Sequence, residues 1–313
     1  MRRFILKRLG LALITLVLVS IVLFLTAEVV PGDVGRKILG PYATAEQVDR
    51  VNEELGLDRP LPVRYADWAF DFIRGDWGTS YLLNVGVQPL VLERLGNSLI
   101  LGGYALLLVV PLSIALGVVA ALNYGKALDR LVSVTGLSLL ALPEFVAGVI
   151  LIVIFAVSLG WFPASASVPS GPIDALYQLT LPAIPLVLVL FGYISRMARA
   201  GTVDSLFSNY TRTAVLKGLP RRTVVWRHVL RNSLLPTISV VAVQIGYLVG
   251  GLVVIETLFN YPGIGKLIID SARQNDLPVL EATVLISAVL FMVSNLIADL
   301  LYGILNPRVR LAG

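Results

Sequence analysis

The sequence contains no cysteine and only one histidine among its 313 residues. The missing cysteines exclude disulfide bonds, thiol catalysis and thiolate metal sites, and one histidine offers little for metal ligation or histidine-based catalysis. Charge is scarce as well, since 14% of the residues are charged where a soluble domain carries roughly 25%. We therefore expect a chain that holds no cofactor or metal of its own and that is not built as a soluble domain.

Apolar residues take the place of the missing charge. They make up 57% of the chain, and the mean hydropathy is +0.84, as is typical of an integral membrane protein. The 27 glycines and 17 prolines, several of them inside apolar runs, favour membrane-spanning helices over a β-barrel of short alternating strands. The expected fold class is all-α and polytopic.

Six apolar runs are candidates for membrane-spanning helices, because about 20 apolar residues cross roughly 30 Å of hydrocarbon. They cover residues 9–30, 98–122, 131–159, 179–194, 234–258 and 279–305. The fourth run is short and is broken by Pro182 and Pro185. The first run follows four basic residues and lacks a small-x-small cleavage site, so we expect an uncleaved signal-anchor helix and not a removed signal peptide.

One stretch of soluble character, residues 31–96, separates the N-terminal helix (1–30) from a core that contains the other five spans (97–313). Thr44 and Gln47 have the spacing of a capping box at the start of a short helix. Three aromatic residues then recur at helical spacing, namely Tyr65, Trp68 and Phe72. The stretch is therefore predicted to be a helical insert whose aromatic residues pack or anchor at the membrane face.

The distribution of basic residues predicts the orientation in the membrane. If the N-terminus is cytoplasmic, the inside segments carry sixteen Lys and Arg against two acids, whereas the outside segments carry nine against thirteen acids. The inside segments are then residues 1–8, 123–130, 195–232 and 306–313. Because cytoplasmic loops are enriched in Lys and Arg, both termini are predicted to be cytoplasmic and the insert extracytoplasmic.

A basic cassette, residues 207–236, lies between the fourth and fifth runs and holds six Lys and Arg, the single histidine and no acid. Topology explains its charge, so we do not expect nucleic-acid binding. Its apolar residues follow helical spacing on both sides of Gly218-Leu219-Pro220. They are Phe207, Tyr210, Ala214, Leu216 and Leu219 before the break, and Val224, Val225, His228 and Val229 after it. This pattern predicts two short helices hinged at a glycine, an element on which a soluble partner could dock.

The basic cassette resembles the EAA loop of ABC importer permeases, in the form of the peptide-permease branch. The resemblance rests on Arg212-Thr213-Ala214-x-x-Lys217-Gly218 and, nine residues later, His228-x-Leu230-Arg231-Asn232. Motifs along nearly the whole chain agree: Pro31-Gly32-Asp33, Gly75-Asp76-x-Gly78-Thr79-Ser80, Glu256-Thr257-Leu258-Phe259-x-Tyr261-Pro262-Gly263-Ile264-Gly265 and Asn306-Pro307-Arg308. The chain is thus similar to the first membrane subunit, the B type, of a dipeptide or oligopeptide importer.

This resemblance implies a type I ABC importer transmembrane domain that works with several partners. The chain would pair with a second, homologous permease around a central pathway, and an extracytoplasmic solute-binding protein would deliver the solute. Two cytoplasmic ATPases would bind ATP and Mg and hydrolyse the ATP, so the permease itself would be non-catalytic. Closure of the ATPases would then drive alternating access. The location implied is the cytoplasmic or inner membrane of a bacterium or archaeon, crossed several times.

The resemblance also assigns roles within the coupling loop, residues 201–232. ATPase coupling falls to seven residues: Arg212, Thr213, Ala214, Lys217, Gly218, His228 and Arg231. Other branches of the family carry Glu-Ala-Ala where this chain has Arg-Thr-Ala. We therefore do not assume an acidic contact to the ATPase.

Two acids are candidates for lining the translocation pathway, because charged groups inside a membrane are costly and usually functional. Glu144 follows a proline near the middle of its run, at a position where the branch usually has a small residue. It could attract a peptide amino terminus or a cationic side chain, or it could be paired by the partner permease. Glu256 lies near the outer end of its run, where a structural role is equally open.

Two functions of other classes remain as alternatives: a membrane scaffold or receptor, and a self-contained secondary transporter. The sequence lacks a P-loop, since Asn260-Tyr-Pro-Gly-Ile-Gly265-Lys266-Leu267 has neither its first glycine nor its final hydroxyl. A secondary transporter commonly shows internal repeats and buried acids in corresponding positions, and neither is evident. A scaffold does not account for the prolines inside several spans. We therefore favour the interpretation that the chain is a subunit of a transporter.

Overall fold

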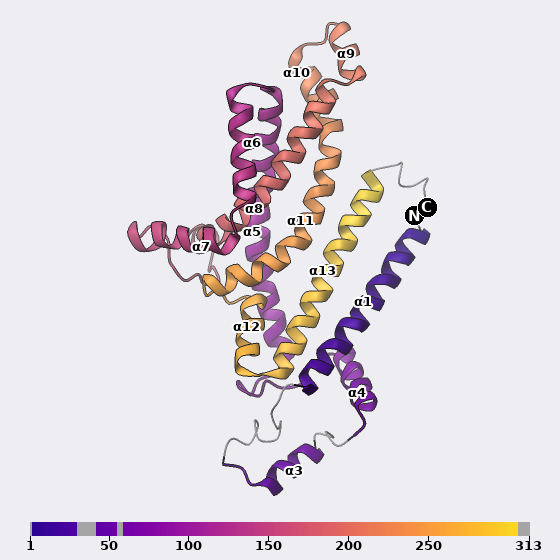
Figure 1. The fold of residues 1–313 in the computed structure, drawn as a ribbon, viewed down its shortest axis with the longest axis vertical. Coiled ribbons are helices and arrows are strands. Elements are labelled where there is room, and N and C mark those ends of the chain that lie inside the picture. The colour runs from indigo at the N-terminus through magenta and orange to yellow at the C-terminus, as the bar shows by residue number, and fades with distance from the viewer. Residues whose placement is uncertain (1, 30–41, 55–58, 306–313) are drawn as a thin grey trace.

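The computed structural model describes residues 2–29, 42–54 and 59–305, and this part of the chain is helical, as predicted (Figure 1). The first half contains α1 (Arg2–Val29), α3 (Ala45–Glu54), α4 (Leu61–Arg74), α5 (Val87–Leu122), α6 (Ala127–Leu140), α7 (Glu144–Leu151) and the π-helical η1 (Ile152–Ser158). The second half contains α8 (Pro172–Leu206), α9 (Asn209–Leu216), α10 (Arg221–Thr223), the π-helical η2 (Val224–Val229), α11 (Leu230–Leu258), α12 (Ile264–Gln274) and α13 (Leu277–Leu305).

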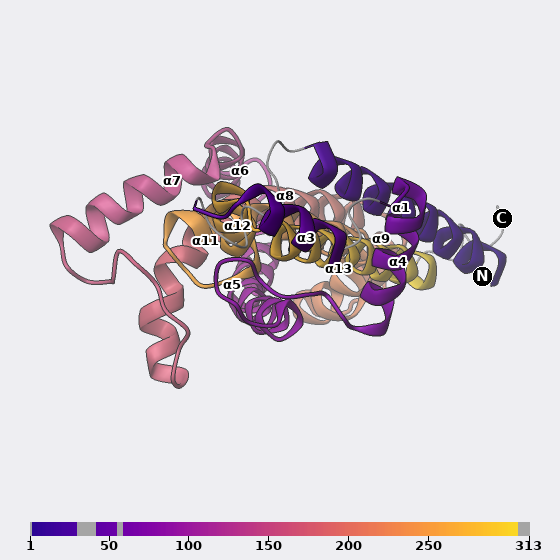
Figure 2. The same cartoon turned by 90° about the horizontal axis from the view of Figure 1, so that it is seen from below.

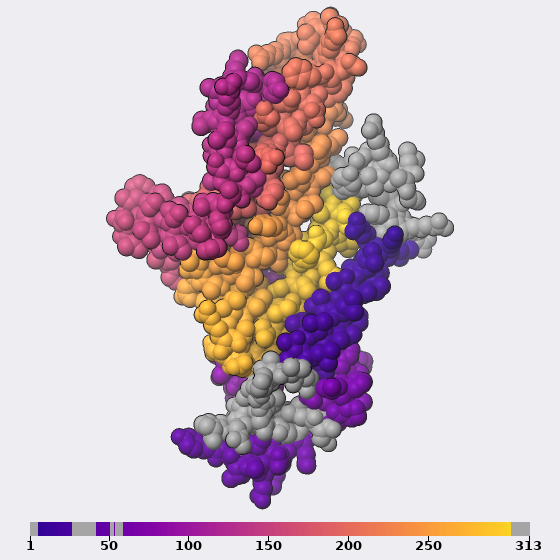
Figure 3. Space-filling model, in the orientation of Figure 1, coloured from indigo at the N-terminus to yellow at the C-terminus, as the bar shows by residue number. Residues whose placement is uncertain are grey.

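Five helices in the described residues are long and apolar enough to cross a membrane, and a bent pair brings the number to six if it counts as one span. That pair covers the predicted span 131–159, which is sharply bent, because α6 and the α7–η1 segment meet at 102°. Pro143 explains the bend: it has φ −60° and ψ 137° and lies directly before α7, and a proline disfavours helical conformation in the residue that precedes it. The α7–η1 arm therefore leaves the bundle sideways (Figures 2 and 3).

The fourth predicted span needs correction, because α8 is one helix of 35 residues with Pro182 and Pro185 inside it. The prolines were expected to break the run, since each removes a backbone donor. Both are buried, as are Leu181, Ala183 and Leu186 around them. Packing on neighbouring helices holds the segment helical in spite of the two lost hydrogen bonds.

Helix α8 lies at the centre of the bundle and contacts α5, α6 and α11. Small residues allow the close approach: a Cβ on Gly117 of α5 would lie 2.5 Å from the carbonyl oxygen of Ser195, and one on Gly192 of α8 would lie 2.5 Å from that of Gly136 of α6. Close backbone contact through glycines is a common way to pack helices in membranes. The backbone of α8 is thereby held firmly against two neighbours.

The two ends of the bundle are arranged as the charge pattern predicts. Helices α9 and α10, the α5–α6 turn, the first turn of α1 and the last turn of α13 all lie toward one end, and α12 and the insert lie toward the other (Figure 1). Arg8 of α1 forms an ion pair with Asp299 of α13 at 3.2 Å. Thr44 and Gln47 exchange the two hydrogen bonds of the predicted capping box at the start of α3.

The insert is attached to α1 through aromatic side chains. Phe24 of α1 lies 5.6 Å from the ring of Tyr65 and 5.9 Å from that of Trp68, both on α4. The Tyr65 hydroxyl also shares a hydrogen bond of 2.8 Å with Ser20. The aromatic residues predicted at helical spacing therefore serve as packing contacts. Gly56, a residue suited to end the short helix that begins at the capping box, falls outside the described residues.

A buried ion pair ties the α5–α6 turn to α8, and its loss should be measurable. Asp129 accepts from Arg199 at 2.5 and 2.9 Å and from the amide of Gly125 at 2.9 Å, with a side chain only 4% exposed. Because Arg199 is partly exposed, we expect Asp129→Asn to lower the free energy of unfolding by about 1–2 kcal/mol. Thermal unfolding of the purified protein in detergent would measure this loss.

The matched control is Asp67→Asn. Asp67 also pairs with an arginine, Arg59 at 3.1 Å, but both side chains are more than half exposed. Exposed pairs contribute little, so this variant should unfold like the parent. Equal unfolding temperatures for the two variants would show that the Asp129 pair does not stabilise the fold.

Candidate functional site

The basic cassette folds as two short helices packed on each other at the predicted cytoplasmic end. Ala214 of α9 packs with Val224 and Val229 of η2 and with Leu206 at the end of α8. The hydroxyl of Thr211 donates to the carbonyl of Ser205 at 2.7 Å. These contacts hold α9 at a fixed angle to α8 and α11, so a force on α9 would be transmitted to both long helices.

Gly218 makes the turn between the two helices, as predicted. It has φ +76°, a conformation that only glycine adopts without strain. Its amide donates to the carbonyl of Val215 at 2.9 Å, which ends α9. A Cβ at this position would meet nothing within 4 Å. The requirement for glycine therefore comes from the backbone alone.

Most residues predicted to couple to the ATPase lie on the outside of this element. Arg212, Thr213, Lys217, Gly218 and Arg231 are exposed, whereas His228 is half-buried and Ala214 is buried. Ala214 thus has a packing role inside the cassette. The carbonyl of His228 accepts from the side-chain amide of Asn232 at 2.9 Å.

Part of the apolar stripe predicted from helical spacing is exposed on the cassette. Phe207 and Leu216 are 73% and 79% exposed, and Trp226, which the spacing did not single out, is 67% exposed. Beside them an apolar hollow opens between the α5–α6 turn and the cassette, lined in part by Tyr124, Val215 and Leu219. The cassette therefore presents large apolar side chains among its basic ones, a composition suited to protein docking.

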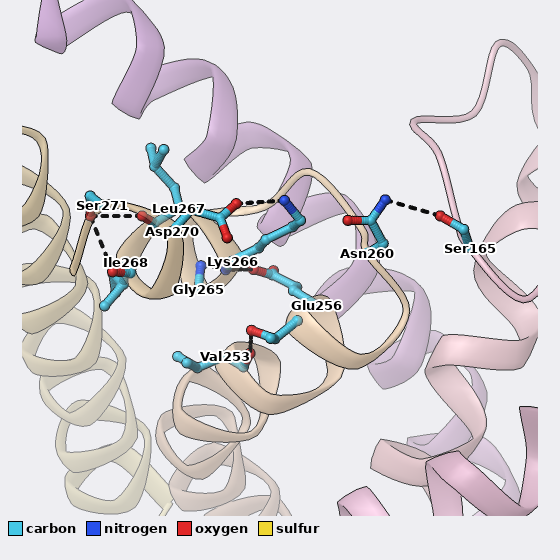
Figure 4. A network of polar contacts seen from close by, with 11 residues as sticks. Ser165, Val253, Glu256, Asn260, Gly265, Lys266, Leu267, Ile268, Asp270 and Ser271 are labelled. Carbon is cyan, nitrogen blue, oxygen red and sulfur yellow. Dashed lines mark hydrogen bonds and ion pairs between the residues drawn. The ribbon is translucent and has the colours of Figure 1, made fainter. Parts of the chain in front are cut away.

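At the opposite end of the bundle, Glu256 of α11 caps the start of α12 (Figure 4). Its carboxylate accepts from the amides of Gly265 at 2.7 Å and Lys266 at 3.3 Å, and from the Ser98 hydroxyl at 2.5 Å. A carboxylate is favourable there because the first amides of a helix lack intrahelical partners. Glu256 has no exposed surface, so the placement supports a structural role and not its prediction as a pathway residue.

The same network explains the motif from Tyr261 to Gly265. A Cβ on Gly263 would overlap the carboxylate of Glu256, and one on Gly265 would overlap the backbone of Val253. The buried Tyr261 hydroxyl donates to the carbonyl of Asn97 at 3.0 Å. The stretch that superficially resembles a P-loop therefore uses its amides to bind the chain's own glutamate.

Glu144 occupies a different environment, at the bend between α6 and α7. Its Oε2 lies against α11, where a Cβ on Gly251 would approach it to 2.8 Å. This oxygen is buried and has no hydrogen-bond partner in the part of the chain that the structure describes. Tyr247 precedes Gly251 by four residues on α11 and therefore lies one turn away on the same face of the helix. Glu144 is thus an unpaired acid at membrane depth.

A hollow on the adjoining surface of the bundle contains polar residues that sequence reasoning missed. It is formed by α6, α8 and α11 and is lined by Ser133, Leu137, Tyr193, Arg196, Met197, Arg199, Ala200 and Val240. Arg196 and Tyr193 are exposed on it, although both belong to a long apolar helix. These two polar residues interrupt the apolar pattern of the helix, and the interruption can be recognised in the sequence. It does not show toward which neighbouring helices their side chains point. Among the described residues, no group of three or more His, Asp or Glu could hold a metal ion.

Comparisons with known proteins agree with this architecture. Residues 113–311 match the family described as binding-protein-dependent transport system inner membrane component, and residues 1–84 match its N-terminal family. A probable peptide ABC transporter permease of Sinorhizobium fredii is 34% identical, over 98% of this chain and 99% of the relative. A putative peptide transport system permease of Brucella abortus and a glutathione transport system permease of Salmonella typhimurium are each 36% identical, over 99% of both chains. The chain therefore belongs to the binding-protein-dependent transport system inner membrane component family, as a membrane-spanning permease subunit of an ABC importer.

Proposed function

We propose that this chain forms half of a translocation pathway for peptides or similar small solutes and couples that pathway to ATP hydrolysis by partner subunits. ABC importers work with ATPases and with a solute-binding protein, and the protein is a multi-pass membrane protein of the bacterial inner membrane type. The solute class is supported by relatives whose names specify peptide and glutathione transport.

The coupling role rests above all on the cassette. It projects at one end of the bundle (Figure 1), it exposes Arg212, Thr213, Lys217 and Gly218, and it is packed rigidly against α8 and α11 through Ala214. An element that is exposed on one side and fixed to two long helices on the other can convert movement of a docked subunit into movement of those helices. ATP and Mg would be bound by the docked ATPases, and the permease would contribute no catalytic group.

The pathway itself we place on the surface of α6, α8 and α11. Tyr193 and Tyr247 are exposed there within the predicted spans, and polar groups inside a membrane normally face a bundle interior or a water-filled cavity and not lipid. A second, homologous permease facing this surface would close the pathway. Of the two acids predicted for the pathway, only Glu144 borders this surface.

Purification from the native host in mild detergent, through a tag on this chain, tests the proposed assembly. We expect one related permease and two ATPase copies per tagged chain, identified by mass spectrometry and native mass, with a binding protein joining when solute is present. Isolation of the chain alone or as a homo-oligomer, without an ATPase in any mild detergent, would contradict the coupling proposal. A scaffold or secondary transporter would then have to be considered.

A further inference from the structure

Glu144 is held in position by three features of its surroundings. Pro143 places it in the first turn of α7, and the bend of 102° turns α7 away from α6 at this point. Gly251 leaves the room that its Oε2 fills, since a Cβ there would come within 2.8 Å. Gly251 precedes the outer end of α11 by seven residues, about 10 Å along the helix. The acid therefore lies inside the membrane on its outer side.

Nothing in the described chain neutralises this acid. In the part of the chain that the structure describes, the Oε2 atom has no hydrogen-bond partner. None of the ion pairs found there includes Glu144. An unpaired carboxylate costs several kcal/mol in a medium of low dielectric constant, as a rough estimate. The site is therefore incomplete until it receives a cation or hydrogen-bond donors from outside the chain.

A neighbouring aromatic residue indicates the chemistry of that missing group. Tyr247 is 50% exposed, and it lies one helical turn from Gly251, the residue against which Oε2 of Glu144 packs. A carboxylate beside an aromatic ring suits an ammonium group, which gains charge neutralisation and cation–π contact together. A single carboxylate is a poor site for a divalent metal, which prefers several oxygen or nitrogen ligands.

Access to the site comes from the same surface. Val240 of α11 lines the hollow on α6, α8 and α11, and Tyr247 lies seven residues, about two turns, further along the same face of that helix. The hollow and the surroundings of Tyr247 therefore share one surface. Arg196 follows Tyr193 by three residues, one turn nearer the predicted cytoplasmic end of α8. Its guanidinium repels a cation, and therefore an ammonium group would be held on the outer side of the hollow.

We propose that Glu144 and Tyr247 form a binding site for the ammonium group of the transported solute, such as the amino terminus of a peptide. This inference rests on the proposed pathway. It makes Glu144 a specificity residue of the permease, which favours solutes with a free amino group over anions after the binding protein has delivered them.

The lack of cysteine in this chain allows a test that needs no knowledge of the solute. Val243→Cys places a single thiol on α11, one turn from Tyr247, at a position that is 58% exposed. In the intact complex in native membranes, the thiol is reacted with a cationic and with an anionic methanethiosulfonate reagent of similar size. We expect Glu144→Gln to lower the ratio of the cationic to the anionic rate by about five- to tenfold, because a nearby negative charge attracts one reagent and repels the other.

A control and a competition experiment complete the test. Ile73→Cys, on the exposed side of α4, should give the same rate ratio with Glu144 and with Glu144→Gln. Tetramethylammonium chloride should slow the cationic reagent at residue 243 more than equal sodium chloride does, and both Glu144→Gln and Tyr247→Leu should abolish that protection. Tyr247→Phe, which keeps the ring, should retain it.

Either of two results would overturn the proposal. A thiol at residue 243 that reacts with neither reagent would show that the surface is not open to water. A rate ratio that Glu144→Gln leaves unchanged would show that the acid is neutralised by the partner permease or carries a proton. In both cases the co-purification of ATPases with the chain would still stand as an independent measure of the importer assembly, so the two proposals fail separately.

Discussion

Alanine in place of Gly265 is expected to prevent accumulation of the folded protein, whereas alanine in place of Gly250 should leave it unchanged. A Cβ on Gly265 would overlap Cα of Val253, lie 2.9 Å from the amide nitrogen of that residue and lie 3.0 Å from Oε2 of Glu256. Backbone atoms cannot move aside as a flexible side chain can, so we expect a loss of about 3 kcal/mol or more. Yield and thermal unfolding, followed by size-exclusion chromatography with fluorescence detection, measure the effect.

Gly250 provides a close control because it lies in α11, and a Cβ there would meet nothing within 4 Å. Its replacement by alanine removes the conformational freedom of glycine from a helix interior and should be neutral or slightly stabilising. If Gly265→Ala folds as well as Gly250→Ala, the close contact between α12 and the end of α11 is not required, and the capping role assigned to Glu256 fails with it.

The elements that local sequence determines were predicted well. Long apolar runs gave the positions of α1, α5, α11 and α13, and the spacing around Gly218 gave the two short helices of the cassette, because both depend on neighbours along the chain. The glycine at 218 could be recognised since its φ of +76° is a local demand. These features would be expected of the same residues in almost any helical membrane protein.

Features that depend on distant residues were not predictable in the same way. Proline bends the chain before Glu144 but is accommodated inside α8 at Pro182 and Pro185, and only the packing around each proline decides between these outcomes. Likewise, Glu144 and Glu256 are both acids in apolar runs, yet among the described residues Oε2 of Glu144 has no partner whereas the Glu256 carboxylate has three donors. The difference comes from residues 98, 265 and 266, which single-sequence reasoning could not place beside Glu256.

Valine in place of Gly218 is expected to uncouple the permease from its ATPases, whereas asparagine should retain most of the coupling. Gly218 has φ +76° and open space around it, so a side chain causes backbone strain and no clash. A non-glycine residue in this conformation costs roughly 1–2 kcal/mol, and a β-branched one more, while asparagine tolerates it best. That strain corresponds to a change of about tenfold or more in the population of the correct turn.

The consequence of this strain should be confined to the cassette. When the turn at Gly218 changes, α9 alters its angle to η2, and the exposed residues Arg212 and Lys217 no longer present the same surface. Solute-stimulated ATP hydrolysis and ATPase retention during purification should therefore both fall by about tenfold in Gly218→Val, while the two permeases still co-purify. Equal ATPase retention in Gly218→Val, Gly218→Asn and the parent would mean that α9 and the turn at Gly218 do not carry the contact. The ATPases would then bind elsewhere on the cytoplasmic end, and the exposed apolar residues Phe207 and Trp226 would be the next surface to alter.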